Sequence, residues 1–131
     1  MEHRGTFQEV IQQFLLEDPR YGMDAYFFVH EGFEYTMRRR REEAEDKGGN
    51  APANLSAEEL SAGLRDYALD EFGPMAAFTL GEWGIRTTSD FGELVYNLIK
   101  MKLFSSNKGD KREDFDGVFD LQAELRKPYE S

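Results

Sequence analysis

The sequence predicts a mainly α-helical protein: five to six helices in one compact domain, residues 1–131, with a small β-hairpin near the carboxyl end. Two observations predict this class. Apolar residues recur at helical spacing along most of the chain. The length of 131 residues suits a single core, and 40% hydrophobic residues provide enough apolar side chain to offset the entropy of ordering the chain.

The first two helices follow from apolar stripes. Thr6 is the candidate N-cap of the first helix, and Asp18-Pro19 ends it. Asp24 is the candidate N-cap of the second helix, whose wide apolar stripe over residues 25–37 predicts the central core helix. Four arginines and then acids extend this helix over residues 38–46. Because this order opposes the helix macrodipole, we expect the extension to fray.

The middle of the chain contains a linker and the clearest helix start. Residues 47–54, rich in Gly, Asn and Ala with one Pro, predict a flexible internal loop. Ser56 and Glu59 have the spacing of a capping box, which starts a third amphipathic helix. Gly73-Pro74 ends that helix and begins a short fourth one, for which Gly84 supplies the stop.

A fifth helix is the second predicted core helix. Ser89 or Asp90 is its candidate N-cap, and apolar positions continue over residues 91–104. Turn-forming residues at 105–110 then separate two apolar stretches, which predicts the β-hairpin. Asp120 is the candidate N-cap of a short final helix.

The carboxyl-terminal half also has the element order of a winged helix. In that fold the second helix of the pair, here residues 89–104, enters the DNA major groove and needs basic or amide side chains. Asp90 and Glu93 fit poorly there, and 26 acidic against 16 basic residues leave a net charge of −10, which repels phosphate. A nucleic-acid-binding regulator is therefore the alternative function. The side chains that favour it are Arg86, Asn97, Lys100, Lys102, Lys108, Lys111 and Arg112.

Common catalytic and metal-binding patterns are missing from the sequence. It has no cysteine, which excludes disulfides and thiolate sites, and no phosphate loop, dinucleotide fingerprint, nucleophile elbow or HExxH motif. His30 and Glu34, one helical turn apart, are only two of the ligands that a zinc site needs. We therefore predict no catalytic residue, no cofactor and no metal.

A second alternative is an enzyme that uses carboxylates. The acids that could act together as an acid–base pair or hold a divalent cation are Asp66, Asp70, Glu71, Asp114 and Asp116. In a chain with 26 acidic residues such clusters arise by chance, so the sequence favours a solvated face over catalysis.

Three segments are distinctive in combination. They are Asp18-Pro19-Arg20-Tyr21 with its continuation to Thr36, Gly84-Ile85-Arg86 with Asp90-Phe91-Gly92-Glu93, and Arg112-Glu113-Asp114-Phe115. Together they resemble a conserved family of small, uncharacterised proteins found mainly in planctomycetes and verrucomicrobia, over residues 7–119. The resemblance implies no activity, and no catalytic residue comes with it.

Aromatic side chains exceed what a small core needs, at 14% of residues. An exposed patch of aromatic and charged side chains is typical of a protein-binding surface. The sequence therefore predicts a non-catalytic intracellular interaction or regulatory module with a protein partner, and it leaves the oligomeric state open. The candidate contact residues are Tyr21, Tyr26, Tyr35, Arg38, Arg39, Trp83, Arg86 and Arg112.

The lengths of the apolar runs indicate where in the cell the protein is expected. The longest is about four residues, far below the roughly 20 that span a bilayer, so no membrane contact is predicted. The first residues lack the apolar region of a secretion signal, and we expect a cytoplasmic protein.

Overall fold

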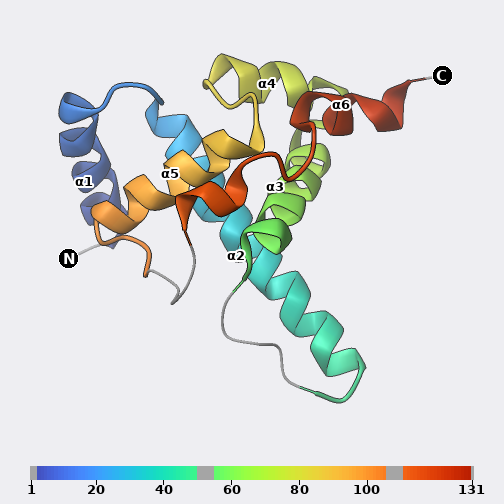
Figure 1. Ribbon diagram of the computed structural model, residues 1–131. Coiled ribbons are helices and arrows are strands. Elements are labelled where there is room, and N and C mark those ends of the chain that lie inside the picture. The colour runs from blue at the N-terminus through green and yellow to red at the C-terminus, as the bar shows by residue number, and fades with distance from the viewer. Residues whose placement is uncertain (1–2, 50–54, 106–110, 131) are drawn as a thin grey trace.

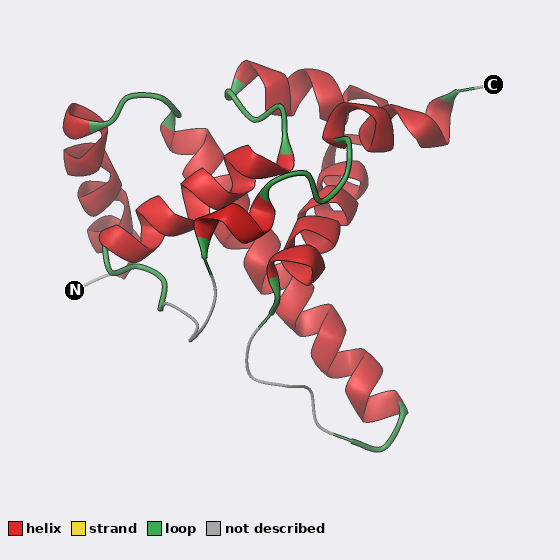
Figure 2. Cartoon of the chain, in the orientation of Figure 1, coloured by secondary structure: helices red, strands yellow, loops and turns green. Residues whose placement is uncertain are grey.

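The regular structure is helical throughout the part of the chain that the computed structural model describes, residues 3–49, 55–105 and 111–130 (Figure 1, Figure 2). This confirms the predicted helical class. The elements are α1 (His3–Glu17), α2 (Met23–Asp46), α3 (Ala57–Phe72), the 3₁₀ helix η1 (Gly73–Met75), α4 (Ala76–Glu82), α5 (Thr88–Lys100), the 3₁₀ helix η2 (Arg112–Phe115), α6 (Leu121–Arg126) and the 3₁₀ helix η3 (Lys127–Tyr129).

Helix α2 is the central element of the packing. It contacts α1, α3 and α5, while α4 and α6 pack on each other and on α3 (Figure 1). Helices α2 and α5 bury the side chains that their apolar stripes predict, among them Val29, Phe91, Leu94 and Leu98. The two predicted core helices are therefore confirmed. No helix among the described residues has both the length and the apolar character needed to cross a membrane.

The predicted β-hairpin is wrong, because no residue in the described ranges forms a strand. Phe115 is instead buried in η2 at 4% exposure, and a Cβ added to Gly92 of α5 would meet its side chain at 2.8 Å. The backbone N–H of Val118 donates to Thr88 Oγ1 at 3.2 Å. The segment after α5 therefore packs on that helix, and the described residues contain no wing of a winged helix. Most of the predicted turn, residues 106–110, lies outside the described residues.

Three helix starts and two helix ends differ from the predicted ones. Helix α1 begins at His3, before Thr6, and α2 has Gly22 as its N-cap, with Asp24 in its first turn. Helix α5 starts from Thr87 and ends at Lys100, four residues before the apolar pattern does. Helix α2 continues to Asp46 without the expected fraying.

The arginine-rich end of α2 is held by acids on α3. Arg39 forms an ion pair with Asp66 at 2.8 Å, and Arg40 forms one with Glu59 at 3.2 Å. Because these ion pairs join two helices, the i, i+4 spacing of charges within α2 could not predict them. They give the extension a partner and explain why it stays helical.

Several local predictions are confirmed. Ser56 and Glu59 form the reciprocal capping box, with bonds of 3.0 and 2.9 Å. Gly84 ends the α4 turn at a φ of 89°, a left-handed conformation that favours glycine. Asp120 caps α6 by accepting from the Ala123 N–H at 3.1 Å. Of the predicted loop 47–54, residues 47–49 form a turn and the rest lies outside the described residues.

Helices α2 and α3 approach closely through two glycines. A Cβ added at Gly32 would overlap the Leu64 side chain, and one added at Gly63 would overlap Thr36. The Thr36 hydroxyl donates to the Gly32 carbonyl at 2.7 Å, which fixes its side chain in place. The crossing therefore has no room for a methyl group at Gly63.

The substitution Gly63→Ala should destabilise the protein by about 1–3 kcal/mol through overpacking, although alanine is the better helix former. Urea unfolding followed by circular dichroism measures the change. Gly81→Ala on α4 is the matched control, because a Cβ there meets nothing within 4 Å. It should be neutral or stabilise by up to about 1 kcal/mol. Equal stability of the two variants would contradict the close crossing.

Candidate functional site

Charged side chains from three separate segments meet near the start of α5, around Glu93. Arg20 pairs with Asp18 at 2.8 Å and with Glu93 at 3.0 Å, and Arg112 pairs with Glu93 at 3.2 Å and with Asp116 at 2.9 Å. Hydrogen bonds from Arg20 lower the pKa of Asp18, and those from Arg112 lower the pKa of Asp116. Each carboxylate in this cluster has a cationic partner, so the arrangement is suited to holding segments together.

The Asp90 carboxylate, in the first turn of α5, forms a second junction between segments. It accepts from the Tyr21 hydroxyl at 2.5 Å and from the backbone N–H groups of Arg86 and Thr87 at 2.8 and 3.0 Å. Burial raises the pKa of the Tyr21 hydroxyl, and the Asp90 carboxylate raises it further. The three segments that carry the family resemblance therefore meet here, in a structural junction.

Asp90→Ala should cost about 1–3 kcal/mol of unfolding free energy, because it removes the Asp90 half of the capping box with Thr87 and leaves the buried Tyr21 hydroxyl without its acceptor. Chemical denaturation provides the measurement. Asp24→Ala, at an exposed first-turn acid of α2, is the control and should stay within about 0.5 kcal/mol of the parent. A loss no larger than that of the control would rule out the junction as a stabilising feature.

Three of the predicted contact residues lie in or against the core. Tyr21 and Tyr26 are 5% and 0% exposed, so neither ring offers a surface to a partner. The Tyr26 hydroxyl accepts from Asn97, which is itself buried and so cannot read DNA bases. Trp83 is half-buried and packs edge-on against the Phe72 ring at 5.6 Å.

The predicted arginines are spread over different surfaces. Arg39 and Arg112 are engaged in the ion pairs described above. Arg86 is exposed and lines a shallow hollow between α4 and α6. Arg38 and Tyr35 alone among the eight candidates lie together in a groove.

This acidic groove, of about 840 Å³, runs between α2 and α3 and is bordered by Phe7 of α1. Among the described residues that line it, Arg38 is the single cation, and four side chains carry carboxylates. Those four are Glu31, Glu34, Asp70 and Glu71. The groove therefore has a negative field of its own, within a chain that is already acidic.

Aromatic rings form the floor of the acidic groove. Tyr67 lies 5.1 Å from the Tyr35 ring, and its hydroxyl donates to Glu31 Oε1 at 3.1 Å. Burial and then the Glu31 carboxylate raise the pKa of Tyr67 to about 12. Arg39 lies 5.2 Å over the Tyr35 ring, which fixes the position of that ring. An aromatic floor with carboxylates on both sides is suited to holding a cation.

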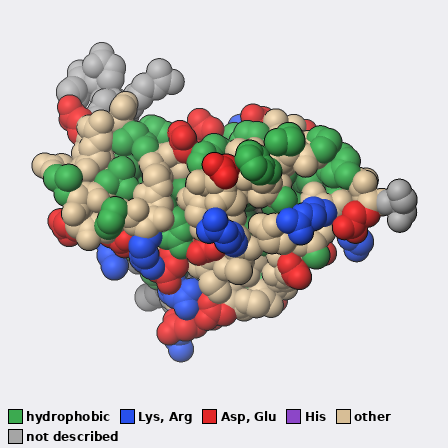
Figure 3. All heavy atoms as spheres, turned by 90° about the horizontal axis from the view of Figure 1, so that it is seen from above, with side chains coloured by type: hydrophobic (Ala, Val, Ile, Leu, Met, Phe, Trp, Pro, Cys, Tyr) green, Lys and Arg blue, Asp and Glu red, His purple; other side chains and the backbone are tan. Residues whose placement is uncertain are grey.

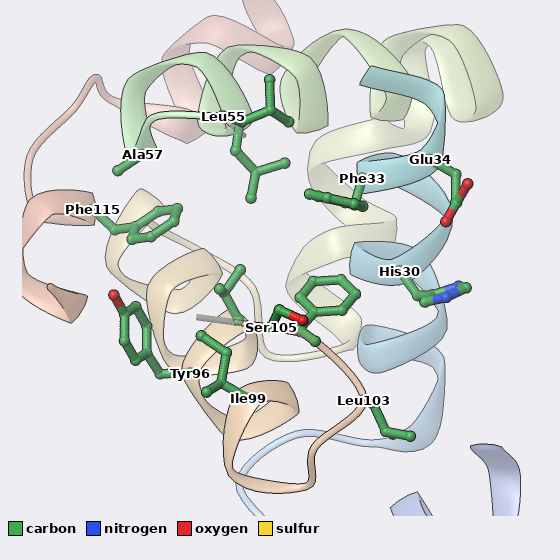
Figure 4. Close-up of a pocket in the computed structure, with 13 residues that line it drawn as sticks. His30, Phe33, Glu34, Leu55, Ala57, Tyr96, Ile99, Leu103, Ser105 and Phe115 are labelled. Atoms are coloured by element: carbon green, nitrogen blue, oxygen red, sulfur yellow. The ribbon is translucent and has the colours of Figure 1, made fainter. Parts of the chain in front are cut away.

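An apolar cavity of about 300 Å³ adjoins the groove (Figure 4). Figure 4 shows Phe33, Leu55 and Phe115 turned toward its centre, with His30 and Glu34 at its edge on α2. His30, Glu34 and Leu103 line the cavity and the groove alike, so the two spaces share a border.

His30 stands at this border between two phenylalanine rings. The centroid of its ring is 4.6 Å from that of Phe7 and 6.0 Å from that of Phe104. Within the described ranges, no cluster of three or more His, Asp or Glu side chains could hold a metal ion. His30 and Glu34 line the border between the cavity and the groove.

The remaining candidate acids have assigned partners or lie in the groove. Asp66 pairs with Arg39 and Arg65, and Asp116 with Arg112. Asp114 accepts from the backbone N–H of Lys111 at 3.0 Å and starts η2. The other two, Asp70 and Glu71, are exposed and belong to the acidic groove.

A second feature of the surface is exposed apolar area near α4 and α6. Met75, Phe78 and Tyr129 are between 50% and 61% exposed. Seen from above, where these helices lie, the molecule shows gathered apolar side chains with charged ones beside them (Figure 3). Nothing in the structure indicates what covers this area.

Sequence reasoning missed the groove as a unit. Glu31 and Glu34 are three residues apart, a spacing that places both on one helical face and could have marked half of the site. The other half, Tyr67 with Asp70 and Glu71, is supplied by α3, and no local signal joins it to α2.

Comparisons with models of known protein families, with curated proteins and with solved structures find no match to this chain. The family resemblance stays a prediction, and the functional argument depends on the site itself.

Tyr67 should ionise at a pH of about 12, which tyrosine-specific NMR titration can follow. Because its folded pKa is above the unfolded value near 10, its contribution to stability should be complete below about pH 10 and fall as the pH rises toward 12. Glu31→Gln should lower this pKa. Glu43→Gln, away from the groove, should leave it unchanged, and an equal shift in both variants would contradict the local effect.

Proposed function

We propose that this protein is a non-catalytic interaction module whose acidic groove binds a basic segment of a partner protein. The observation that carries the proposal is the convergence of four carboxylates over a floor of tyrosine rings. We place the interaction in the cytoplasm, as the sequence-based expectation does.

Charge complementarity supports a basic partner. Glu31 and Glu34 on α2 and Asp70 and Glu71 on α3 line the groove on its two sides. A lysine or arginine side chain lying between them would be attracted by carboxylates from both helices and could stack on the Tyr35 and Tyr67 rings. The net charge of −10 adds long-range attraction, which speeds encounter with a basic segment.

The same charges argue against the two alternatives. A phosphate backbone would meet carboxylates in this groove, which opposes nucleic-acid binding. Of the five candidate acids, Asp66, Asp114 and Asp116 are used in ion pairs and a helix start. The other two, Asp70 and Glu71, are exposed at the groove, whereas acid–base catalysis uses a carboxyl group whose pKa is shifted by burial or by a specific charged partner. A binding role requires only the exposed carboxylates and aromatic rings that the groove already has.

A fluorescein-labelled lysine-rich peptide should bind the protein, and the affinity should fall as salt is raised. The double variant Asp70→Asn/Glu71→Gln should weaken this binding about tenfold, since it removes half of the carboxylates in the groove. Fluorescence polarisation gives the affinity, and backbone amide NMR shifts locate the peptide.

The matched control is Glu42→Gln/Glu43→Gln, which removes the same charge from exposed positions near the end of α2. An equal loss in the control would show that overall charge alone attracts the peptide, and the proposal would fail. Preferential binding of a single-stranded oligonucleotide would support the nucleic-acid alternative in its place.

A further inference from the structure

The apolar cavity beside the acidic groove has the size and lining of a side-chain pocket. Its volume is about 300 Å³, and apolar cavities of about 150 Å³ can hold a benzene ring. It lies at the lower end of the size range of small-molecule sites. The space therefore suits one large apolar side chain better than an extended cofactor.

The residues that line the cavity also favour an apolar side chain as its ligand. Phe33 comes from α2, Leu55 from the residues just before α3, Leu60 from α3, and Val95 and Ile99 from α5. Leu60 and Val95 are 5% and 8% exposed, so the deep walls are hydrocarbon. Water in such a space has few hydrogen-bond partners, and its displacement by an apolar group is favourable.

Polar groups of the site gather at the border with the groove. His30 and Glu34 line both spaces, and the packing of His30 against Phe7 and Phe104 keeps its ring there. A chain segment lying along α2 can therefore place an apolar side chain on one side of His30 and a basic one on the other.

We infer that the partner segment is amphipathic: one large apolar side chain enters the cavity while a neighbouring lysine or arginine lies in the acidic groove. This inference rests on the proposed function and adds the determinant of specificity. A basic charge alone is common on protein surfaces, whereas an apolar anchor at a set distance from it is a selective requirement.

Selection of random displayed peptides on the intact protein tests this without a known partner. The enriched peptides should share one Phe, Leu, Met or Trp at a constant spacing from Lys or Arg. Enrichment of basic peptides without an apolar position would overturn the inference and leave the proposed function standing. Enrichment without basic residues would contradict the proposed function, and no enrichment would contradict both.

Variants of the peptide and of the protein then test whether the apolar position occupies the cavity and the basic position occupies the acidic groove. Alanine at the apolar position should weaken binding to the parent protein about tenfold. The same change should have little effect on Ile99→Trp, whose indole fills the cavity. Ser105→Trp, at an exposed position on the rim, is the second variant in case Ile99→Trp does not fold.

The peptide's basic position provides the matched comparison. Its replacement by glutamine should weaken binding to the parent protein and to Ile99→Trp, and it should weaken binding to Asp70→Asn/Glu71→Gln by a smaller factor, because only Glu31 and Glu34 remain there. Full sensitivity of the cavity variant to the apolar-to-alanine change would overturn the inference. Self-association of the protein that Ile99→Trp abolishes would also overturn it, because a second copy would then occupy the cavity.

Discussion

The Glu93 carboxylate in the second turn of α5 pairs with two guanidinium groups from distant parts of the chain. Arg20 comes from the connection between α1 and α2, and Arg112 comes from η2. Exposed ion pairs of this kind contribute little each, about 0–1 kcal/mol. The ion pairs are supported by apolar packing next to them. Gly92 lets the buried Phe115 ring pack against α5 without an intervening side chain. The junction therefore holds η2 and the connection between α1 and α2 against α5.

The close crossing of α2 and α3 has a different consequence, because it creates the site. The glycines at positions 32 and 63 let the two helices approach until the side chains of one fill the space above the other. Tyr67 of α3 thereby reaches Glu31 of α2, and the acids of both helices line one groove. The groove therefore presents carboxylates from two helices to the same space, which favours a cationic ligand.

The charged cluster around Glu93 and Asp90 differs from the acidic groove in how its carboxylates are paired, and this difference distinguishes a structural cluster from a candidate binding site. Around Glu93 and Asp90, each carboxylate accepts from a guanidinium, a hydroxyl or a backbone N–H group. In the acidic groove, Glu31 accepts from the Tyr67 hydroxyl, but the four carboxylates share a single arginine among the described lining residues. The adjoining cavity has deep walls of hydrocarbon, so the site combines an apolar and an electrostatic element in one surface. A protein segment carries both kinds of side chain, which is why we favour it as the ligand.

The sequence by itself determined the features that depend on neighbours within a few residues: the helical class, the cap at Ser56, the turn at Gly84, and the net charge. It could not determine which aromatic side chains are buried. Tyr26 and Tyr35 belong to the same predicted helix, but one lies in the core and the other borders the groove. Only the tertiary structure decided that difference, and it also placed Phe115 on α5 where a hairpin was predicted. The physical reason is that burial and charge pairing depend on residues far apart in the chain, whose approach no local pattern specifies.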